Sequence, residues 1–148
     1  MNDRQLRQLV ESYQPNPAVV EQLKKVIFVA VVGATSSGKT TIINKLLKTA
    51  PDIKPVISET SRPVRPGEKD GQELFFRTKA DMIDDLKHGR LVQVLLSPYN
   101  EFYGTSPQNY PASGIGVMPV FSYVILAFRS LPFKKMHTAF IVPENYQR

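Results

Sequence analysis

Residues 33–40 carry the clearest chemical signal in this chain, since they read Gly-Ala-Thr-Ser-Ser-Gly-Lys-Thr. Gly33 and Gly38 permit backbone angles that a β-carbon penalises, so successive N–H groups can turn toward a polyphosphate. The Lys39 ammonium can reach the β- and γ-phosphates, and the Thr40 hydroxyl can ligate Mg²⁺. The spacing therefore predicts a nucleoside triphosphate site, made by Gly33, Ala34, Thr35, Ser36, Ser37, Gly38, Lys39, Thr40 and Thr41.

Two elements flank this loop as its chemistry requires. The unbroken apolar run 26–32 is typical of a strand covered on both faces of a parallel sheet. The segment that opens at about Thr40 predicts a helix whose positive dipole end points at the same anion. A glycine-rich turn that binds no ligand is the alternative, and the flanking strand and helix disfavour it.

A second group of polar residues follows at 58–68. Arg62 and Arg65 stand three residues apart, stiffened by Pro63 and Pro66 and preceded by the hydroxyl of Ser58. Guanidinium groups stay charged at physiological pH and offer paired planar donors, so two of them can converge on one phosphate. A proline-stiffened basic surface loop is the alternative, and the phosphate-binding loop upstream weighs against it.

The composition restricts the classes of protein that are possible. The chain has 148 residues, 42% hydrophobic and 22% charged, as expected for one soluble globular domain. It has a net charge of +6 but no run of five basic residues, which argues against a nucleic-acid arm. There is no cysteine, and the two histidines do not stand at metal-ligand spacing. The longest apolar stretch, 115–128, is too short to span a membrane, so we expect a cytoplasmic protein.

Strands and helices alternate along the chain, which favours an α/β fold with a parallel sheet. Helices are predicted at 2–13, 18–25, 41–47, 78–87 and 122–131. Strands are predicted at 26–32, 56–58, 74–76, 91–96, 115–121 and 138–142, with a hairpin-like return at 99–104.

From about Val26 to Val142 the sequence resembles the guanylate kinase family. The loop 33–41, the segment 58–71 and the run Phe-Tyr-Gly-Thr-Ser at 102–106 carry the resemblance. It implies a parallel sheet of the P-loop NTPase type with flanking helices and a small inserted nucleoside-monophosphate-binding subdomain. The implied organisation is a helical extension at 1–25 and a kinase-like domain at 26–148, divided into 26–57, 58–106 and 107–148.

The resemblance also implies a reaction, in which the γ-phosphoryl group of ATP passes to GMP in line. ATP and Mg²⁺ would occupy the loop, with Thr40 on the metal. Lys39, Arg62 and Arg65 would act in catalysis by holding and neutralising the two anions. The GMP phosphate would contact Ser58, Arg62, Arg65 and Tyr103, and the base would contact Thr105 and a residue of the strand 91–96.

The sequence departs from the family pattern at four places. Leu74 stands where the family has a tyrosine, and Gln93 stands where the family reads guanine with a glutamate. Residues 118–122 lack the aspartates that the family carries there, and the lid and C-terminal helices have no counterpart before Arg148. Gln93 offers one acceptor and one donor group in place of two acceptors, which weakens the expected preference for guanine.

Two other functions remain open from the sequence. A non-catalytic nucleotide- or peptide-binding module on the same fold would explain the missing acids and lid, but it has no need of Lys39. Another small phosphotransferase, acting for instance on a ribose phosphate, would use the same loop. The paired arginines after the loop favour the nucleoside monophosphate kinase.

Overall fold

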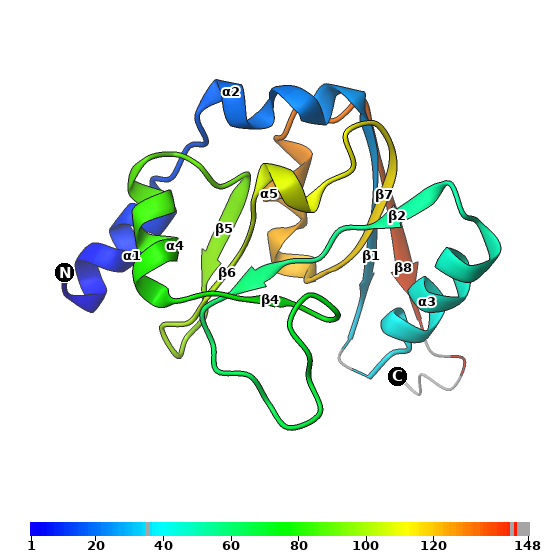
Figure 1. Cartoon of the computed structure of the whole chain (residues 1–148), viewed down its shortest axis with the longest axis horizontal. Coiled ribbons are helices and arrows are strands. Elements are labelled where there is room, and N and C mark those ends of the chain that lie inside the picture. The colour runs from blue at the N-terminus through cyan, green and yellow to red at the C-terminus, as the bar shows by residue number, and fades with distance from the viewer. Residues whose placement is uncertain (35, 143, 145–148) are drawn as a thin grey trace. The chain divides into compact units, whose positions relative to one another are not determined.

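The computed structural model describes residues 1–34, 36–142 and 144, and it divides the chain into two compact units (Figure 1). Unit 1 consists of Met1–Glu21 and Ile57–Asn109, and unit 2 consists of Gln22–Val56 and Tyr110–Arg148. The phosphate-binding loop belongs to unit 2, whereas the arginine segment belongs to unit 1.

Unit 2 is built on a four-stranded sheet, in which all paired strands are parallel. Its strands follow the order β2 (Ile53–Pro55), β7 (Gly114–Val120), β1 (Val26–Gly33) and β8 (Lys135–Ile141). The predicted α/β class and parallel sheet are confirmed. The loop leaves the end of β1, which is a central strand, and this position is where parallel α/β sheets bind ligands.

Two groups of apolar side chains make the core of unit 2. In the first group, the Phe28 ring stacks on the rings of Phe128 and Phe133, and the ring centroids are 5.1 and 4.6 Å from that of Phe28. In the other, Ile43 of helix α3 (Lys39–Thr49) packs with Val31 and Val117 of the sheet. The short helical segments of this part of the chain are η1 (Glu21–Lys25), η3 (Ser122–Val124) and α5 (Ile125–Arg129).

Unit 1 contains a second, smaller sheet with both parallel and antiparallel pairs. Its strands follow the order β4 (Phe75–Phe76), β3 (Glu59–Thr60), β6 (Phe102–Thr105) and β5 (Gln93–Leu96). Helices α1 (Asp3–Glu11) and α4 (Lys79–Lys87) cover one face through a cluster of Leu6, Met82, Leu86, Leu91 and Phe102. Helix α4 begins at the predicted N-cap, where Thr78 Oγ1 accepts a hydrogen bond from the Asp81 N–H at 3.1 Å. The remaining helical segments are α2 (Pro17–Val20) and η2 (Pro107–Asn109).

The N-terminal helix α1 is attached to unit 1 at both of its ends. Asn100, in the β5–β6 turn, accepts a hydrogen bond from the Arg7 guanidinium and donates one to Asp3, both at 2.8 Å. Beyond the helix, the Tyr13 hydroxyl donates to the Leu91 carbonyl and accepts from the Leu91 N–H. Burial raises the pKa of Tyr13 to about 12. The helix is therefore part of the hydrophobic core of unit 1.

One predicted strand was wrong. The segment 56–58 is the connection between β2 and β3, and the boundary between the two units falls after Val56. Val56 is buried and its N–H bonds to the Val117 carbonyl, so its apolar character reflects the end of the β2 pairing. The last strand also starts earlier than predicted, at Lys135, and at its start the exposed residues Lys135 and His137 alternate with the half-buried Met136 and Thr138.

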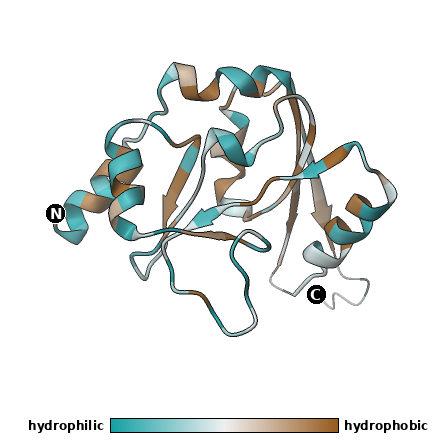
Figure 2. Ribbon diagram, viewed as in Figure 1, coloured by the Kyte–Doolittle hydropathy of each residue, from teal (hydrophilic) through white to brown (hydrophobic). Residues whose placement is uncertain are grey.

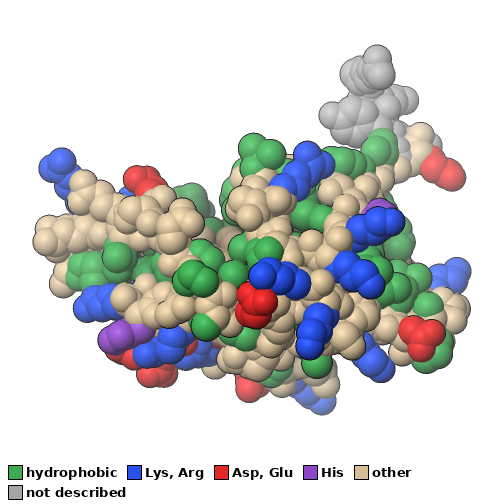
Figure 3. All heavy atoms as spheres, turned by 90° about the horizontal axis from the view of Figure 1, so that it is seen from above, with side chains coloured by type: hydrophobic (Ala, Val, Ile, Leu, Met, Phe, Trp, Pro, Cys, Tyr) green, Lys and Arg blue, Asp and Glu red, His purple; other side chains and the backbone are tan. Residues whose placement is uncertain are grey.

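Figure 2 shows the strands of unit 2 mainly in brown and the loop 61–73 of unit 1 mainly in teal. On the face displayed in Figure 3, lysine and arginine side chains lie singly or in small groups with acidic side chains among them. The positive charge is therefore dispersed over that face. None of the helices in the described part of the chain is long and apolar enough to cross a bilayer.

Candidate nucleotide-binding site

The phosphate-binding loop of unit 2 has a glycine at each of its ends. Gly38 caps helix α3 with φ of +92°, an angle that L side chains rarely adopt. A β-carbon on Gly33 would stand 2.6 Å from Ser37 Oγ and 3.1 Å from the Ile141 carbonyl oxygen, so a larger residue there would have to displace the Ser37 side chain. Ser36 also has a positive φ of 61°. These angles turn the backbone between β1 and α3 so that the first turn of the helix opens outward.

Lys39 is held inside this loop. Its Nζ donates to the Gly33 carbonyl at 2.6 Å and to the Ala34 carbonyl at 2.8 Å. A cavity of about 300 Å³ lies against the loop, lined by Ser36, Ser37, Gly38, Lys39, Thr40 and Thr41. Seven of the nine predicted loop residues thus line the cavity or bond to Lys39 through their carbonyls, in addition to Lys39 itself. Thr35 lies outside the described residues.

Several hydroxyl groups of the loop line the cavity, those of Ser36, Ser37, Thr40 and Thr41. Ser37 Oγ is buried and has no hydrogen-bond partner among the described residues. Thr40 is exposed in the first turn of α3. The described residues contain no group of three His, Asp or Glu side chains that could hold a metal ion. A divalent cation at this loop would therefore depend on hydroxyl, phosphate and water oxygens, which suits Mg²⁺.

In unit 1, Arg62 is buried and paired. Its Nη1 and Nη2 donate to the two carboxylate oxygens of Glu68 at 2.8 and 2.6 Å, and Nη1 also donates to the Pro63 carbonyl. The guanidinium lies 5.4 Å from the centre of the Phe76 ring. Its pKa is raised, chiefly by the hydrogen bond to Glu68 and to a smaller degree by Tyr103. The same ion pair lowers the pKa of Glu68 to about 2.

This arrangement leaves one edge of Arg62 for another anion. A guanidinium has five N–H donors, and the bonds to Glu68 and Pro63 use three of them. The other two, on Nε and Nη2, lie side by side on the edge that binds phosphate in a bidentate manner. Glu68 therefore orients Arg62 through one edge of the guanidinium, and the other edge could hold a phosphate.

Arg65 and Ser58 are less fixed by the fold. The Arg65 N–H donates to Glu68 Oε2 at 2.8 Å, and its side chain is exposed. Ser58 is half-buried, and its carbonyl accepts from the Phe75 N–H at 2.8 Å. The sequence therefore predicted the segment, whereas the role of Glu68 as the partner of both arginines was missed. The local signal was the carboxylate three residues after Arg65.

The predicted residues of strands β5 and β6 share one face of the sheet. Gln93 is opposite Thr105 and Leu95 is opposite Tyr103 in the antiparallel register, so these four side chains point the same way. The other face carries Phe102, which packs in the cluster with α1 and α4. Thr60 of β3 is opposite Tyr103 on the face of Gln93.

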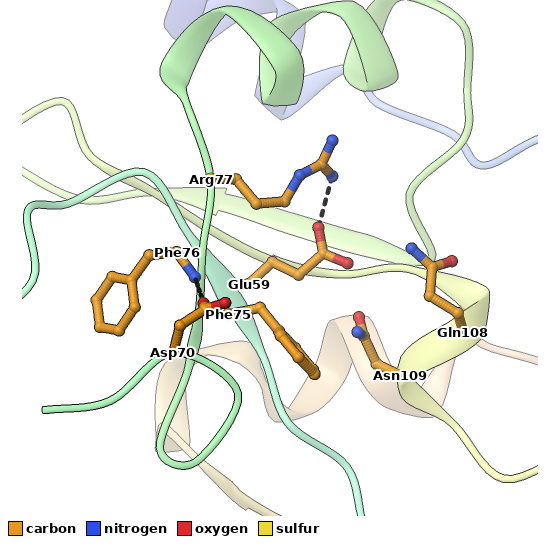
Figure 4. Close-up of a pocket in the computed structure, with 7 residues that line it drawn as sticks. All are labelled: Glu59, Asp70, Phe75, Phe76, Arg77, Gln108 and Asn109. Carbon is orange, nitrogen blue, oxygen red and sulfur yellow. Dashed lines mark hydrogen bonds and ion pairs between the residues drawn. The ribbon is translucent and has the colours of Figure 1, made fainter.

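A pocket of about 240 Å³ in unit 1 was not predicted from the sequence (Figure 4). Its lining residues are Glu59, Asp70, Phe75, Phe76, Arg77, Gln108 and Asn109. Figure 4 shows Arg77 reaching across to the buried carboxylate of Glu59, to which Nη1 donates at 2.6 Å. The same Nη1 donates to Asp85 of α4 at 2.7 Å. Glu59 and Arg77 are 18 residues apart in the sequence, so no local sequence pattern predicts that they pair.

Comparison with known proteins gives the family. The model of the guanylate kinase family matches residues 24–110. A guanylate kinase of Syntrophus aciditrophicus (strain SB) is 35% identical over 79 residues, which are 53% of this chain and 38% of that relative. One of Oceanobacillus iheyensis is 37% identical over 87 residues, which are 59% of this chain and 41% of that relative. The crystal structure of guanylate kinase from Anaplasma phagocytophilum has a similar fold, with a TM-score of 0.62 at 23% identity over 81% of this chain and 61% of that one.

The matched range covers more than half of the sequence and includes the loop at 33–41, the arginine segment at 58–71 and the face formed by β5 and β6. The chain belongs to the guanylate kinase family. It spans about two fifths of the length of these two relatives.

Proposed function

We propose that this chain transfers the γ-phosphoryl group of ATP to a nucleoside monophosphate, with GMP as acceptor and GDP as product. The observation that carries the proposal is that one family match contains both the loop around Lys39 and the segment around Arg62. Transfer between two phosphates requires positioning and charge stabilisation, with no covalent nucleophile. It also requires no general base, because the acceptor phosphate is already ionised.

On the donor side, the loop supplies backbone N–H groups and one cation. Lys39 would exchange the Gly33 and Ala34 carbonyls for the β- and γ-phosphate oxygens of ATP, since a phosphate is the stronger acceptor. The helix dipole of α3 points its positive end at the same oxygens. Mg²⁺ would be held by the Thr40 hydroxyl and the phosphates, where it would neutralise negative charge.

On the acceptor side, Arg62 would receive the GMP phosphate on the guanidinium edge that Glu68 does not use. Tyr103 lies beside it and Arg65 has an exposed side chain in the same segment. Ser58, Gln93 and Thr105 complete the proposed contacts, the last two with the base. Arg62 and Arg65 would also offset the repulsion between the two anions.

The test is acceptor-dependent release of ADP from ATP, with GMP as acceptor. Lys39→Ala should lower ATP affinity by about 10- to 100-fold, as expected for loss of hydrogen bonds to a charged group. Lys45→Ala, an exposed lysine of the same helix, is the matched control and should leave ATP affinity unchanged. Arg62→Ala should weaken GMP far more than ATP.

The outcome also separates the alternatives. ATP binding without acceptor-dependent turnover by the full gene product would favour a nucleotide-binding module over a kinase. Equal effects of Lys39→Ala and Arg62→Ala on both nucleotides would contradict the assignment of one site to each anion. A sugar phosphate that competes with GMP would favour the other phosphotransferase.

A further inference from the structure

We propose that the pocket around Glu59 in unit 1 binds an aliphatic diamine, with one ammonium group at Glu59, the other at Asp70 and the methylene chain on the Phe75 ring (Figure 4). The proposal goes beyond the kinase reaction and does not depend on it, because none of the residues that line this pocket is among those proposed to contact ATP or GMP. The pocket would therefore be a second ligand site of unit 1.

The Glu59 side chain lies on the face of the small sheet that α4 covers. Glu59 is opposite Gly104 in the β3–β6 ladder, and a β-carbon on Gly104 would stand 3.7 Å from the Met82 side chain of α4. Successive residues of a strand point to opposite faces of a sheet, so Tyr103 and Thr105 face the other way. The sheet therefore separates a ligand at Glu59 from the residues proposed to hold GMP.

Negative charge exceeds positive charge in this pocket, although the whole chain has a net charge of +6. The charged lining residues are two carboxylates, Glu59 and Asp70, and one guanidinium, Arg77. Arg77 also serves a third carboxylate, since its Nη1 donates to Asp85 at 2.7 Å. The Glu59 side chain is 3% exposed, and a charge with so little water around it interacts strongly with nearby charges. The pocket therefore favours a cation and disfavours an anion such as a phosphate.

A hydrogen bond within unit 1 holds one oxygen of each lining carboxylate. Arg77 Nη1 donates to Glu59 Oε2 at 2.6 Å, and the Phe76 N–H donates to Asp70 Oδ1 at 2.7 Å. Figure 4 shows the second oxygen of Glu59 turned across the pocket, toward the side formed by Asn109. A cation can therefore bind Glu59 through this oxygen while the bond to Arg77 stays in place, and charge-assisted hydrogen bonds of this kind are strong.

The Phe75 ring supplies an apolar wall for the chain that joins the two ammonium groups. Phe75 is 36% exposed, and Figure 4 shows its ring pointing toward Asn109. A single ammonium, such as the end of a lysine side chain, would neutralise only one of the two carboxylates. A diamine places one cation at each carboxylate and its methylenes on the ring, as lysine stems pack on apolar surfaces. The aromatic face also attracts an ammonium directly.

The experiment titrates the whole chain with putrescine, a four-carbon diamine, and with butylamine, the monoamine of the same length. Backbone amide signals followed by NMR at constant ionic strength give both affinities, and at neutral pH both amines are protonated, as lysine is. Putrescine should bind about tenfold more tightly than butylamine, because its second ammonium group is held close to the second carboxylate. The largest signal changes should fall on the lining residues Glu59, Phe75 and Asn109. Equal affinities, or signal changes centred elsewhere, would overturn the inference.

Asp70→Asn tests the second carboxylate without disturbing the buried ion pair. The amide keeps an oxygen that can accept the Phe76 N–H but removes the charge, so putrescine should bind within about threefold of butylamine. Asp52→Asn makes the same change at an exposed aspartate of unit 2 and is the matched control, which should leave both affinities unchanged. Equal losses in the two variants would contradict the site, since they would reflect only the net charge of the protein.

Added GMP separates this pocket from the proposed acceptor site. Putrescine should bind equally well with and without GMP, because the two ligands would lie on opposite faces of the small sheet. Loss of putrescine binding on addition of GMP would place the amine at the acceptor site and would overturn the inference. The titration with putrescine needs no nucleotide, so a failure of the proposed kinase reaction leaves its outcome unaffected.

Discussion

At the scale of single residues, Glu68 determines how Arg62 is presented. The carboxylate binds both terminal nitrogens of the guanidinium and also accepts the Arg65 N–H. It therefore fixes the side chain of one arginine and the backbone of the other. A phosphate-binding arginine that is oriented in advance loses less conformational entropy when its ligand arrives. In the proposed function, Glu68 would be a positioning residue of the acceptor site.

Glu68→Gln should reveal this role through its pH dependence. Hydrogen bonding to Arg62 lowers the pKa of Glu68 from 4.5 to about 2. A lowered pKa in the folded state means that the carboxylate stabilises the fold above pH 4.5 and that this contribution is lost as the pH falls through about 2. The melting temperature of Glu68→Gln should therefore lie below that of the wild type by a constant amount from pH 5 to 8, and the two should converge near pH 2. Thermal unfolding followed by circular dichroism measures the melting temperatures of the two proteins at each pH. A difference in melting temperature that is as large at pH 2 as at pH 7 would contradict the stabilising role of the Glu68 carboxylate.

At the scale of elements, one ionic network joins strand β3, the end of β4 and helix α4. Arg77 Nη1 binds Glu59 and Asp85, and Arg90 binds Asp84 and Asp85 at the end of the helix. Burial lowers the pKa of Arg77, but its hydrogen bonds to Glu59 and Asp85 outweigh that effect and the pKa is raised. The Glu59 side chain is only 3% exposed, and Arg77 is its ion-pair partner at 2.6 Å.

Arg77→Met should therefore destabilise unit 1 by about 3 kcal/mol, because it leaves a buried carboxylate without its partner. The double variant with Glu59→Gln should recover much of this loss. Arg90→Met is the matched control: Arg90 is 46% exposed, and removing an exposed pair should alter stability by at most about 1 kcal/mol. Urea denaturation measures the free energy of unfolding of the wild type and the three variants. Equal losses of stability in Arg77→Met and Arg90→Met would show that the burial of Glu59 has no energetic consequence.

Helix α1 provides a second test at this scale. Leu6 is 4% exposed within the cluster of unit 1, so Leu6→Ala should lower the free energy of unfolding by about 3 kcal/mol. Leu126→Ala makes the same chemical change at a side chain that is 71% exposed, and should change it by less than about 0.5 kcal/mol. Urea midpoints compare the two. A small effect at Leu6 would mean that the N-terminal helix is an appendage and not part of the core.

The elements also show what the sequence could predict. The loop at 33–41 was accessible because all its determinants are local: an apolar strand, two glycines, a lysine and a helix. The segment 56–58 was misread because Val56 is buried at the end of one strand pairing and not inside a strand of its own. The bonds of Arg77 to Glu59 and Asp85 depend on how strands and helix pack, and no spacing in the sequence reveals them.

The sequence likewise predicted some features of the candidate site and not others. Arg62 and Tyr103 were recognised from a motif, but the motif does not show that Glu68 takes one edge of the guanidinium. Gln93 was recognised as a departure from a pattern. Its burial and its register with Thr105 are consequences of sheet pairing, which only the three-dimensional structure supplies.

At the scale of the whole molecule, the chain has two hydrophobic cores, one in each unit. The proposed ATP residues all belong to unit 2, and the proposed GMP residues all belong to unit 1. A ligand stabilises only the states in which its site is formed, and different parts of a protein open with different free energies. Each nucleotide should therefore stabilise its own unit.

Hydrogen exchange followed by mass spectrometry measures this division. ATP at 100 times its dissociation constant should slow exchange in β1 and α3 by an amount equivalent to at most about 2.7 kcal/mol, with little change in β5 and β6. GMP should protect the segment 58–68 and strands β5 and β6, and leave α3 unchanged. In Lys39→Ala, at the same ATP concentration, the ATP effect should fall to between about 0.4 and 1.4 kcal/mol while the GMP effect remains, because in the proposed function the lysine would contact only the triphosphate. Protection of both units by either nucleotide alone would show that the two units respond as one body, and it would contradict the assignment of one nucleotide to each.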